Sequence, residues 1–251
     1  MNSQKTRRAF IQGSAAIGAG LVISACGGEN KDQSGKQAEG SGAKKGEKEE
    51  GGEVTATEDL MREHGVIRRA LLVYTAAAGK LRAYPASILP DALQKTARLF
   101  RDFGEDYHER KLEEAYIFPA VKKAAGPATG YPDLLVVQHN RGREITDYIL
   151  SVTQGAKLGA ANAEPLARAM ESLVLMYRHH AAREDTIVFP AWKKTLSEKD
   201  LDEMSEKFEE IEHQQFGKDG FDEAAKQIGE IEGMLGLTDI SQFTAPPPPK
   251  A

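Results

Sequence analysis

The feature that most constrains this chain is a long helical periodicity. In segment 166–191, mostly apolar residues form a helical seam at alternating steps of four and three: Leu166, Met170, Leu173, Tyr177, His180, Glu184, Ile187 and Ala191. This spacing places all of them on one helix face. Shorter seams of the same kind occur in segments 60–71 and 135–149. After Thr55 no convincing two-residue alternation appears, so the pattern predicts an all-α fold.

The helical part of the sequence is internally repeated. Residues 108–123 align without gaps on residues 179–194, and both segments carry His, Glu, an acid pair, Phe-Pro-Ala and Lys-Lys. The segments around His64 and His139 align upstream in the same way. The sequence therefore predicts two duplicated helical hairpins that form an antiparallel four-helix bundle over residues 55–195.

The segments that flank this bundle differ from it in composition. Residues 196–243 continue the helical pattern, and Ser197 with Asp200 has the spacing of a capping box, so a short C-terminal helical extension is expected. Residues 244–251 form a Pro-rich tail. Residues 27–54 are rich in Gly, Lys and acids, with too little apolar surface to offset the entropy of ordering, and are predicted to be a disordered tether.

The first 26 residues have the layout of an export signal. A polar start leads to Arg7-Arg8, and then to a short apolar stretch rich in Ala and Gly that ends at small residues. The arginine pair resembles a twin-arginine signal, a route that exports folded proteins. The segment 23–26 resembles a bacterial lipobox, and it holds the only cysteine, Cys26. We expect lipidation of Cys26 and a domain anchored to a membrane outside the bacterial cytoplasm.

Charge and cysteine content exclude several function classes. The formal net charge is −5, so the chain has no basic excess for phosphate neutralisation, and no nucleic-acid partner is expected. A single cysteine rules out intrachain disulfides and thiolate-ligated iron–sulfur clusters.

Histidines and long acids occupy positions where a helical core is expected. His64, His139 and His180 lie on the apolar seams, and the remaining helix contributes His108. Two glutamates follow at corresponding places of the repeat, Glu113 and Glu184. Burying these groups without partners would cost on the order of several kcal/mol each. A shared metal centre explains them, and nitrogen and oxygen ligands without thiolate suit iron, manganese or zinc.

Together these motifs resemble the hemerythrin-like, or His-His-Glu cation-binding, family. The resemblance covers roughly residues 60–194 and is carried by Glu63-His64, His108, Glu113-Glu114, Phe118-Pro119, Gln138-His139, His180, Glu184-Asp185 and Phe189-Pro190. It implies a bundle that binds two non-haem iron ions of the Fe–O–Fe type. Dioxygen or another small ligand would be the partner, for binding, storage, sensing, or handling of iron and redox stress. By position, the imidazole ligands would be His64, His108, His139 and His180, with Glu113 and Glu184 bridging or capping the metals.

Two positions leave the ligand set open. The oxygen carriers of the family have a fifth histidine one turn after the ligand corresponding to His139, and here that place is Arg143. The repeat alignment matches His108 with His179, whereas the helical seam selects His180. We predict His180 as the ligand and keep His179 as a possible additional one.

The spacing between His108 and Glu113 is irregular for an α-helix. Five residues leave the two side chains roughly 140° out of phase, and the apolar seam slips by one residue at the same place. One extra residue in a π-type turn reconciles the two halves, and such turns concentrate at functional sites. The alternatives are a regular helix with Glu113 reaching round, or Glu109 as the ligand.

Two other interpretations compete with this one. A ferritin-like di-iron oxidase uses Glu-x-x-His motifs, and Glu105-x-x-His108 and Glu210-x-x-His213 both fit that spacing. A metal-free bundle acting as an interaction module is the second alternative.

Overall fold

The computed structural model describes residues 54–84, 90–155 and 157–249. Within these ranges the chain is helical and contains no strand, which confirms the predicted all-α class. No helix in the described ranges is both long and apolar enough to cross a membrane. The predicted export signal, Cys26, and the tether up to residue 53 lie outside the described residues.

Eleven helical segments follow one another along the described chain. They are α1 (Ala56–Ala83), α2 (Pro90–Leu99), η2 (Phe100–Ile117), α3 (Phe118–Lys123), α4 (Tyr131–Val152), α5 (Ala160–Arg183), η3 (Glu184–Val188), α6 (Phe189–Lys193), α7 (Glu198–Phe216), α8 (Gly220–Leu235) and η4 (Ile240–Phe243). The segments η2 and η3 are π-helical, and η4 is a short 3₁₀-helix.

Local sequence signals account for the ends of the main helices. A capping box starts α1, in which Thr55 and Glu58 satisfy each other's backbone N–H groups. The predicted capping box of Ser197 and Asp200 starts α7. Gly217 caps the C-terminus of α7 with a φ of 68°, which glycine adopts far more readily than other residues.

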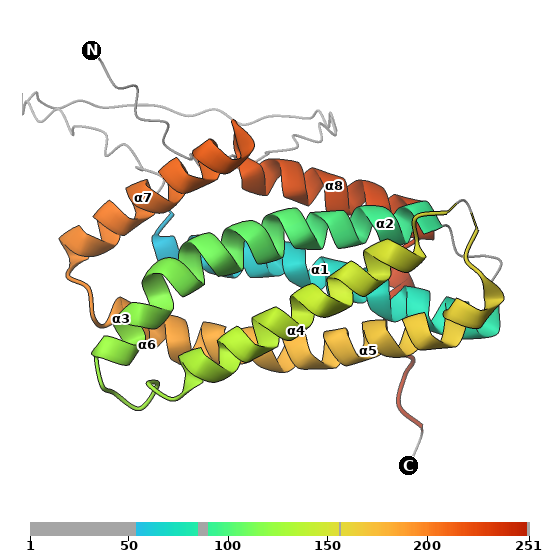
Figure 1. Cartoon of the computed structure of the whole chain (residues 1–251), viewed down its shortest axis with the longest axis horizontal. Coiled ribbons are helices and arrows are strands. Elements are labelled where there is room, and N and C mark those ends of the chain that lie inside the picture. The colour runs from blue at the N-terminus through green and yellow to red at the C-terminus, as the bar shows by residue number, and fades with distance from the viewer. Residues whose placement is uncertain (1–53, 85–89, 156, 250–251) are drawn as a thin grey trace, which may run out of the picture. The chain divides into compact units, whose positions relative to one another are not determined.

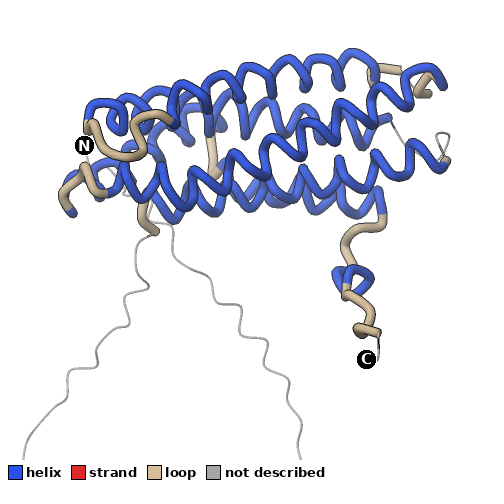
Figure 2. Tube along the Cα trace, turned by 90° about the horizontal axis from the view of Figure 1, so that it is seen from below, coloured by secondary structure: helices blue, strands red, loops and turns tan. Residues whose placement is uncertain are grey.

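The helices α1, α4 and α5 and the continuous stretch from α2 through η2 pack around one core (Figures 1 and 2). Helix α1 packs on α5 and on η2, while α4 packs on α5, α2 and η2. The neighbours therefore follow in the closed order α1, η2, α4, α5 and back to α1. The core between them contains the large buried aromatics Tyr74, Phe100 and Tyr177. This helical bundle positions the site described below.

The predicted π-type turn between His108 and Glu113 is confirmed, and it belongs to a longer segment. The π-helical segment η2 covers the whole range Phe100–Ile117, and the N–H of Phe118 donates to the carbonyl of Glu113, five residues back. The segment η3 repeats the arrangement, with the N–H of Phe189 donating to the carbonyl of Glu184. Each π-segment is followed closely by a proline, Pro119 or Pro190, which lacks an N–H and crowds the carbonyl four residues earlier. A wider turn relieves that crowding, so α3 and α6 follow directly on the π-segments.

Helices α7 and α8 form a further hairpin on the outside of the bundle. Helix α7 packs on α1 and η2, and α8 packs on α1 and α2. At one end Trp192 stacks on Phe208 of α7, with ring centroids 5.7 Å apart. The hairpin therefore covers mainly the first half of the repeat.

Candidate metal centre

Four histidines from four different segments meet inside the bundle. His64 comes from α1, His108 from η2, His139 from α4 and His180 from α5, and each is at most 3% exposed. Their Nε2 atoms form two close pairs: His64 with His108, and His139 with His180, each at 3.0 Å. Two nitrogens at this distance are suited to sharing one cation.

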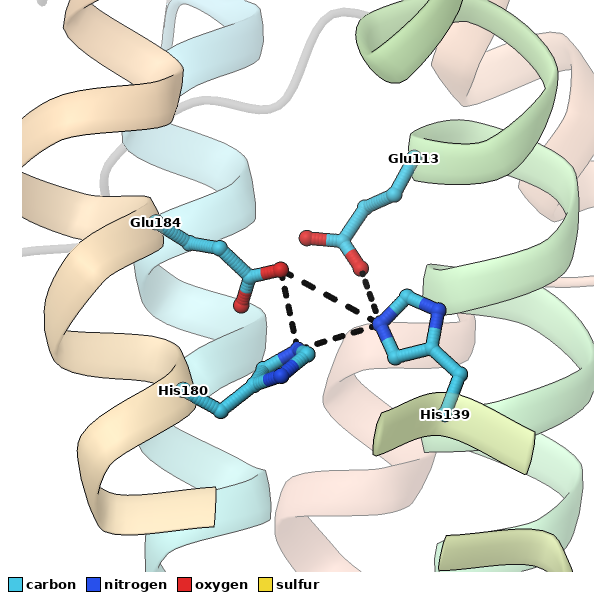
Figure 3. Close-up of side chains that lie close together, drawn as sticks. All are labelled: Glu113, His139, His180 and Glu184. Carbon is cyan, nitrogen blue, oxygen red and sulfur yellow. Dashed lines mark hydrogen bonds and ion pairs between the residues drawn. The ribbon is translucent and has the colours of Figure 1, made fainter. Parts of the chain in front are cut away.

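Two fully buried carboxylates lie between the histidine pairs. Glu113 places Oε1 3.4 Å from Nε2 of His108 and Oε2 3.3 Å from Nε2 of His139. Glu184 places Oε2 3.5 Å from Nε2 of His64 and Oε1 2.9 Å from Nε2 of His180. Each glutamate therefore reaches both histidine pairs, and Figure 3 shows the half formed by Glu113, His139, His180 and Glu184.

The nitrogens and oxygens of the cluster are arranged better for binding cations than for hydrogen bonding to one another. All four oxygens of Glu113 and Glu184 are buried and accept no hydrogen bond from the described residues, although imidazole nitrogens lie close. Buried carboxylates without partners are strongly unfavourable. An ion bonded at about 2.1 Å to ligands at right angles holds neighbouring donor atoms about 3 Å apart. The 3.0 Å nitrogen pairs match this requirement.

A polar side chain on a neighbouring segment contacts the Nδ1 atom of each imidazole, on the side that faces away from the cluster. Nδ1 of His108 lies 2.6 Å from Glu63, and Nδ1 of His139 lies 2.8 Å from Glu114. Nδ1 of His180 lies 2.9 Å from Gln138, and Nδ1 of His64 lies 2.6 Å from Asp185. A hydrogen bond at Nδ1 directs Nε2 and its lone pair toward the cluster, as is usual for metal-binding histidines. Asp185 also pairs with Arg68.

The partners that hold the imidazoles follow a ring around the bundle. Each lies directly beside a residue of the cluster in the sequence: Glu63 beside His64, Glu114 beside Glu113, Gln138 beside His139, and Asp185 beside Glu184. Thus α1 supports the histidine of η2, η2 that of α4, α4 that of α5, and η3 at the end of α5 that of α1. Every neighbouring pair of helices contributes one such bond.

Aromatic rings cover the two histidines that lie at equivalent places of the repeat. Phe118 stacks on His139 with ring centroids 5.5 Å apart, and Phe189 stacks on His64 at 5.3 Å. These phenylalanines begin α3 and α6, directly after the π-segments. The duplicated Phe-Pro motif therefore closes both sides of the centre and excludes water from it.

The charges at the candidate centre change the proton affinity of its histidines and glutamates. Burial lowers the pKa of His108, but the charges of Glu113 and Glu63 outweigh it and raise the pKa well above the usual value. For His139, burial is outweighed by Glu109, Glu113 and Glu114, which raise its pKa to about 10. Burial raises the pKa of Glu113, yet His108 and His139 together hold it well below the usual value. Protons and cations compete for the same nitrogens, so metal affinity rises with pH.

Arg143, one helical turn after His139, places a guanidinium beside the centre. Arg143 donates to Glu109 at 3.0 Å and to Glu114 at 2.6 Å. Glu109, Glu114 and His139 also come close enough to form a third possible cation group, but the positive charge of Arg143 lies against both carboxylates and opposes a cation there. The hydroxyl of Tyr177 donates to Glu109 at 2.6 Å. Gly142 makes room for that hydroxyl, since a Cβ there would lie 2.2 Å from it.

The structure brings together all six residues we predicted as ligands: His64, His108, Glu113, His139, His180 and Glu184. His179 is exposed and contacts Arg183, so it lies apart from this cluster. Glu109 is buried but faces Tyr177 and Arg143, and its nearest approach to His139 is 3.9 Å at Nδ1, the nitrogen turned away from the cluster.

The two Glu-x-x-His motifs that would form a ferritin-like site do not come together in the structure. Glu210 and His213 are exposed on α7. Glu105 is buried but is bonded to Thr146 and paired with Arg101. Among the described residues, the groups suited to a cation are the two histidine–glutamate clusters and the group opposed by Arg143.

Sequence reasoning did not assign roles to the four residues that hold the imidazoles. Their signal was present, because each is a polar residue directly beside a predicted ligand. This signal alone could not identify their roles, because each of the four residues contacts a histidine on another helix and not the predicted ligand beside it in the sequence. The contact between Tyr177 and Glu109 was also missed.

Comparison with known proteins agrees with this geometry. Residues 55–192 match the hemerythrin HHE cation binding domain, so the chain belongs to this family of metal-binding helical proteins. It is 40% identical over 242 residues to an uncharacterized protein of Mycobacterium tuberculosis, covering 95% of this chain and 90% of the relative. An uncharacterized protein of Mycobacterium bovis matches to the same extent. No solved structure matches the chain.

Proposed function

We propose that this protein binds two non-haem iron ions and uses them to bind or sense dioxygen or a related small ligand. One ion would take His64 and His108, the other His139 and His180, and Glu113 and Glu184 would bridge them. The observation that carries the proposal is the arrangement in one buried site of four imidazole nitrogens and four carboxylate oxygens that accept no hydrogen bond from the described residues. The proposed fold is the family's antiparallel four-helix bundle, built from two hairpins.

The donor set supports iron and a count of two. Imidazole and carboxylate without thiolate suit iron among the redox-active metals. Both glutamates approach both histidine pairs, as bridging ligands do. Two imidazoles and two carboxylate oxygens would occupy four positions of each ion, which leaves room for a small ligand. When bound, the ions would supply that open position and a change of redox state.

The protein's own residues would fix and shield this site. The four partners at Nδ1 orient the imidazoles, and Phe118 and Phe189 exclude water from two sides. Arg143 stands where the oxygen carriers have a fifth ligating histidine, and its charge is committed to Glu109 and Glu114. This difference favours sensing or the handling of iron and redox stress over reversible oxygen carriage.

Metal analysis and optical spectra of the purified chain test the proposal. We expect two iron ions per chain, near-ultraviolet oxo-to-iron bands, and a shifted spectrum with azide. His180→Ala should lose bound iron, whereas His179→Ala, the matched control with an exposed imidazole, should keep it. A wild-type chain that takes up no iron, or a His180→Ala variant with full iron content, would contradict the proposal.

We also propose that the chain is exported from the bacterial cytoplasm and held at a membrane through lipid on Cys26. The sequence pattern of residues 1–26 supports this proposal. A twin-arginine route would suit a domain that folds around its metal ions before export.

A further inference from the structure

The end of α7 places an aromatic ring against η2. Phe216, the last residue of α7, lies edge-on to Tyr107 with ring centroids 5.2 Å apart, and 6.1 Å from the ring of Phe103. Gly220, which begins α8, seats the same ring, because a Cβ there would lie 2.3 Å from Phe216. The turn between α7 and α8 therefore holds Phe216 tightly against Tyr107.

Tyr107 connects this packing to the candidate metal centre. Its side chain is fully buried, and its hydroxyl donates to Oε1 of Glu63 at 3.0 Å. The other oxygen of Glu63 lies 2.6 Å from Nδ1 of His108. Three consecutive contacts thus lead from the C-terminal hairpin to one imidazole of the centre.

The second half of the repeat lacks this connection among the described residues. His180 is supported by Gln138, a neutral amide, and the residue before His180 is the exposed His179. The main contacts of α7 and α8 are with α1, α2 and η2. The hairpin therefore packs mainly on α1 and on the α2–η2 stretch, which carry His64 and His108.

We propose that Tyr107 and Phe216 are positioning residues, through which the C-terminal hairpin sets the orientation of His108. The inference rests on the proposed function, and it divides the centre into two unequal halves. The His64–His108 half depends on the α7–α8 hairpin, and the His139–His180 half does not. Loss of a group that orients a metal-binding histidine weakens metal affinity by about 10- to 100-fold.

Cobalt binding to chains that keep only one histidine pair tests this division. The variant His139→Ala/His180→Ala keeps the first pair, and the variant His64→Ala/His108→Ala keeps the second. Adding Tyr107→Phe or Phe216→Leu should weaken cobalt binding about tenfold in the first background and leave it unchanged in the second, as measured by calorimetry. Equal weakening in both backgrounds, or none in either, would overturn the inference.

Phe208→Leu is the matched control, because it removes similar packing from the same helix. Phe208 stacks on Trp192 and lies edge-on to Tyr116. Phe208→Leu should lower stability without changing cobalt affinity in either background. If it weakened cobalt binding only in the background that keeps His64 and His108, any loosening of α7 would produce the effect, which would contradict a specific role of Phe216.

Nitrogen-15 NMR of the histidine rings in the full chain, without added metal, gives a second measurement. Tyr107→Phe and Phe216→Leu should shift the Nδ1 resonance of His108 and leave that of His180 in place. Unchanged His108 signals would overturn the inference even if cobalt binds. Absence of cobalt binding to the wild-type chain would instead contradict the proposed function, and the ring signals would then decide the positioning role.

Discussion

Glu105 is a buried acid that the candidate metal centre does not use. It is fully buried, accepts a hydrogen bond from Thr146 at 2.6 Å and pairs with Arg101 at 2.8 Å. Burial, together with the charge of Glu109, raises the pKa of Glu105 from 4.5 to about 7. The carboxyl is therefore easier to keep protonated in the folded chain than in the unfolded chain, and its ionisation destabilises the fold.

Glu105→Gln should remove this pH dependence. Unfolded chains ionise the carboxyl near pH 4.5 and folded chains near pH 7, so the wild type loses stability as pH rises between these values. The difference between these two pKa values corresponds to a loss of at most about 3 kcal/mol in the free energy of unfolding. Glutamine keeps an acceptor for Thr146 but loses the pairing with Arg101, so we expect a gain of about 1–2 kcal/mol at pH 8 and no gain at pH 4.

Denaturant unfolding of the metal-depleted chain across this pH range measures the effect. Glu144→Gln, at an exposed position on α4, is the control and should leave the profile unchanged. Parallel stability profiles for the wild type and Glu105→Gln would contradict the prediction.

Sequence reasoning at the residue scale reached the six residues that cluster at the candidate centre but not what surrounds them. Histidines and glutamates on an apolar seam are recognisable because burial alone would be unfavourable for them. The roles of Glu63, Glu114, Gln138 and Asp185 depend on which helix lies beside which, and no periodicity within one helix carries that information.

The π-segments show how much a single residue changes the phase of a helix. His108 and Glu113 are five apart, whereas His180 and Glu184 are four apart, yet both pairs converge on one centre. The slip in the apolar seam predicted the wide turn in η2. It did not predict η3 or the full length of η2, because i→i+5 bonds that leave an apolar seam unbroken have no distinct sequence pattern.

Helix α7 offers a test at the scale of one element. Ser197 caps its N-terminus, accepting a bond from the N–H of Asp200. Ser197→Ala should lower the free energy of unfolding by about 1 kcal/mol. Because the loss is local, hydrogen exchange should accelerate in α7 more than in α4 or α5.

Ser151, a serine on the surface of α4, provides the control substitution. Ser151 bonds to the carbonyl of Tyr148 within α4 and caps no helix start. Ser151→Ala should therefore leave exchange in α7 unchanged. Uniform acceleration across the bundle in Ser197→Ala would show instead that α7 does not open on its own.

At the scale of the whole molecule, the proposed anchor predicts where the domain is found. In a bacterial host that processes lipoproteins, the wild-type chain should be recovered with membranes, because an acylated N-terminal cysteine carries apolar chains into the bilayer. Cys26→Ser removes the acceptor thiol, so that variant should be recovered in the soluble fraction. Cell fractionation with mass spectrometry of the mature N-terminus measures both.

Ser34→Ala, in the predicted tether, is the control and should behave like the wild type. An intact, unmodified Met1 on the mature wild-type protein, or equal membrane recovery of Cys26→Ser, would contradict the anchor.

The ring of bonds behind the imidazoles has a consequence for the origin of the fold. Two of its four bonds lie within a hairpin, from Glu63 to His108 and from Gln138 to His180, and the other two join one hairpin to the other. A single hairpin cannot close such a ring, but two identical hairpins related by a two-fold axis can. The duplicated sequence is thus the form expected from an ancestral homodimer whose two copies became fused into one chain. Divergence of two fused copies would account for the glutamate that contacts His108 and the glutamine that contacts its counterpart, His180.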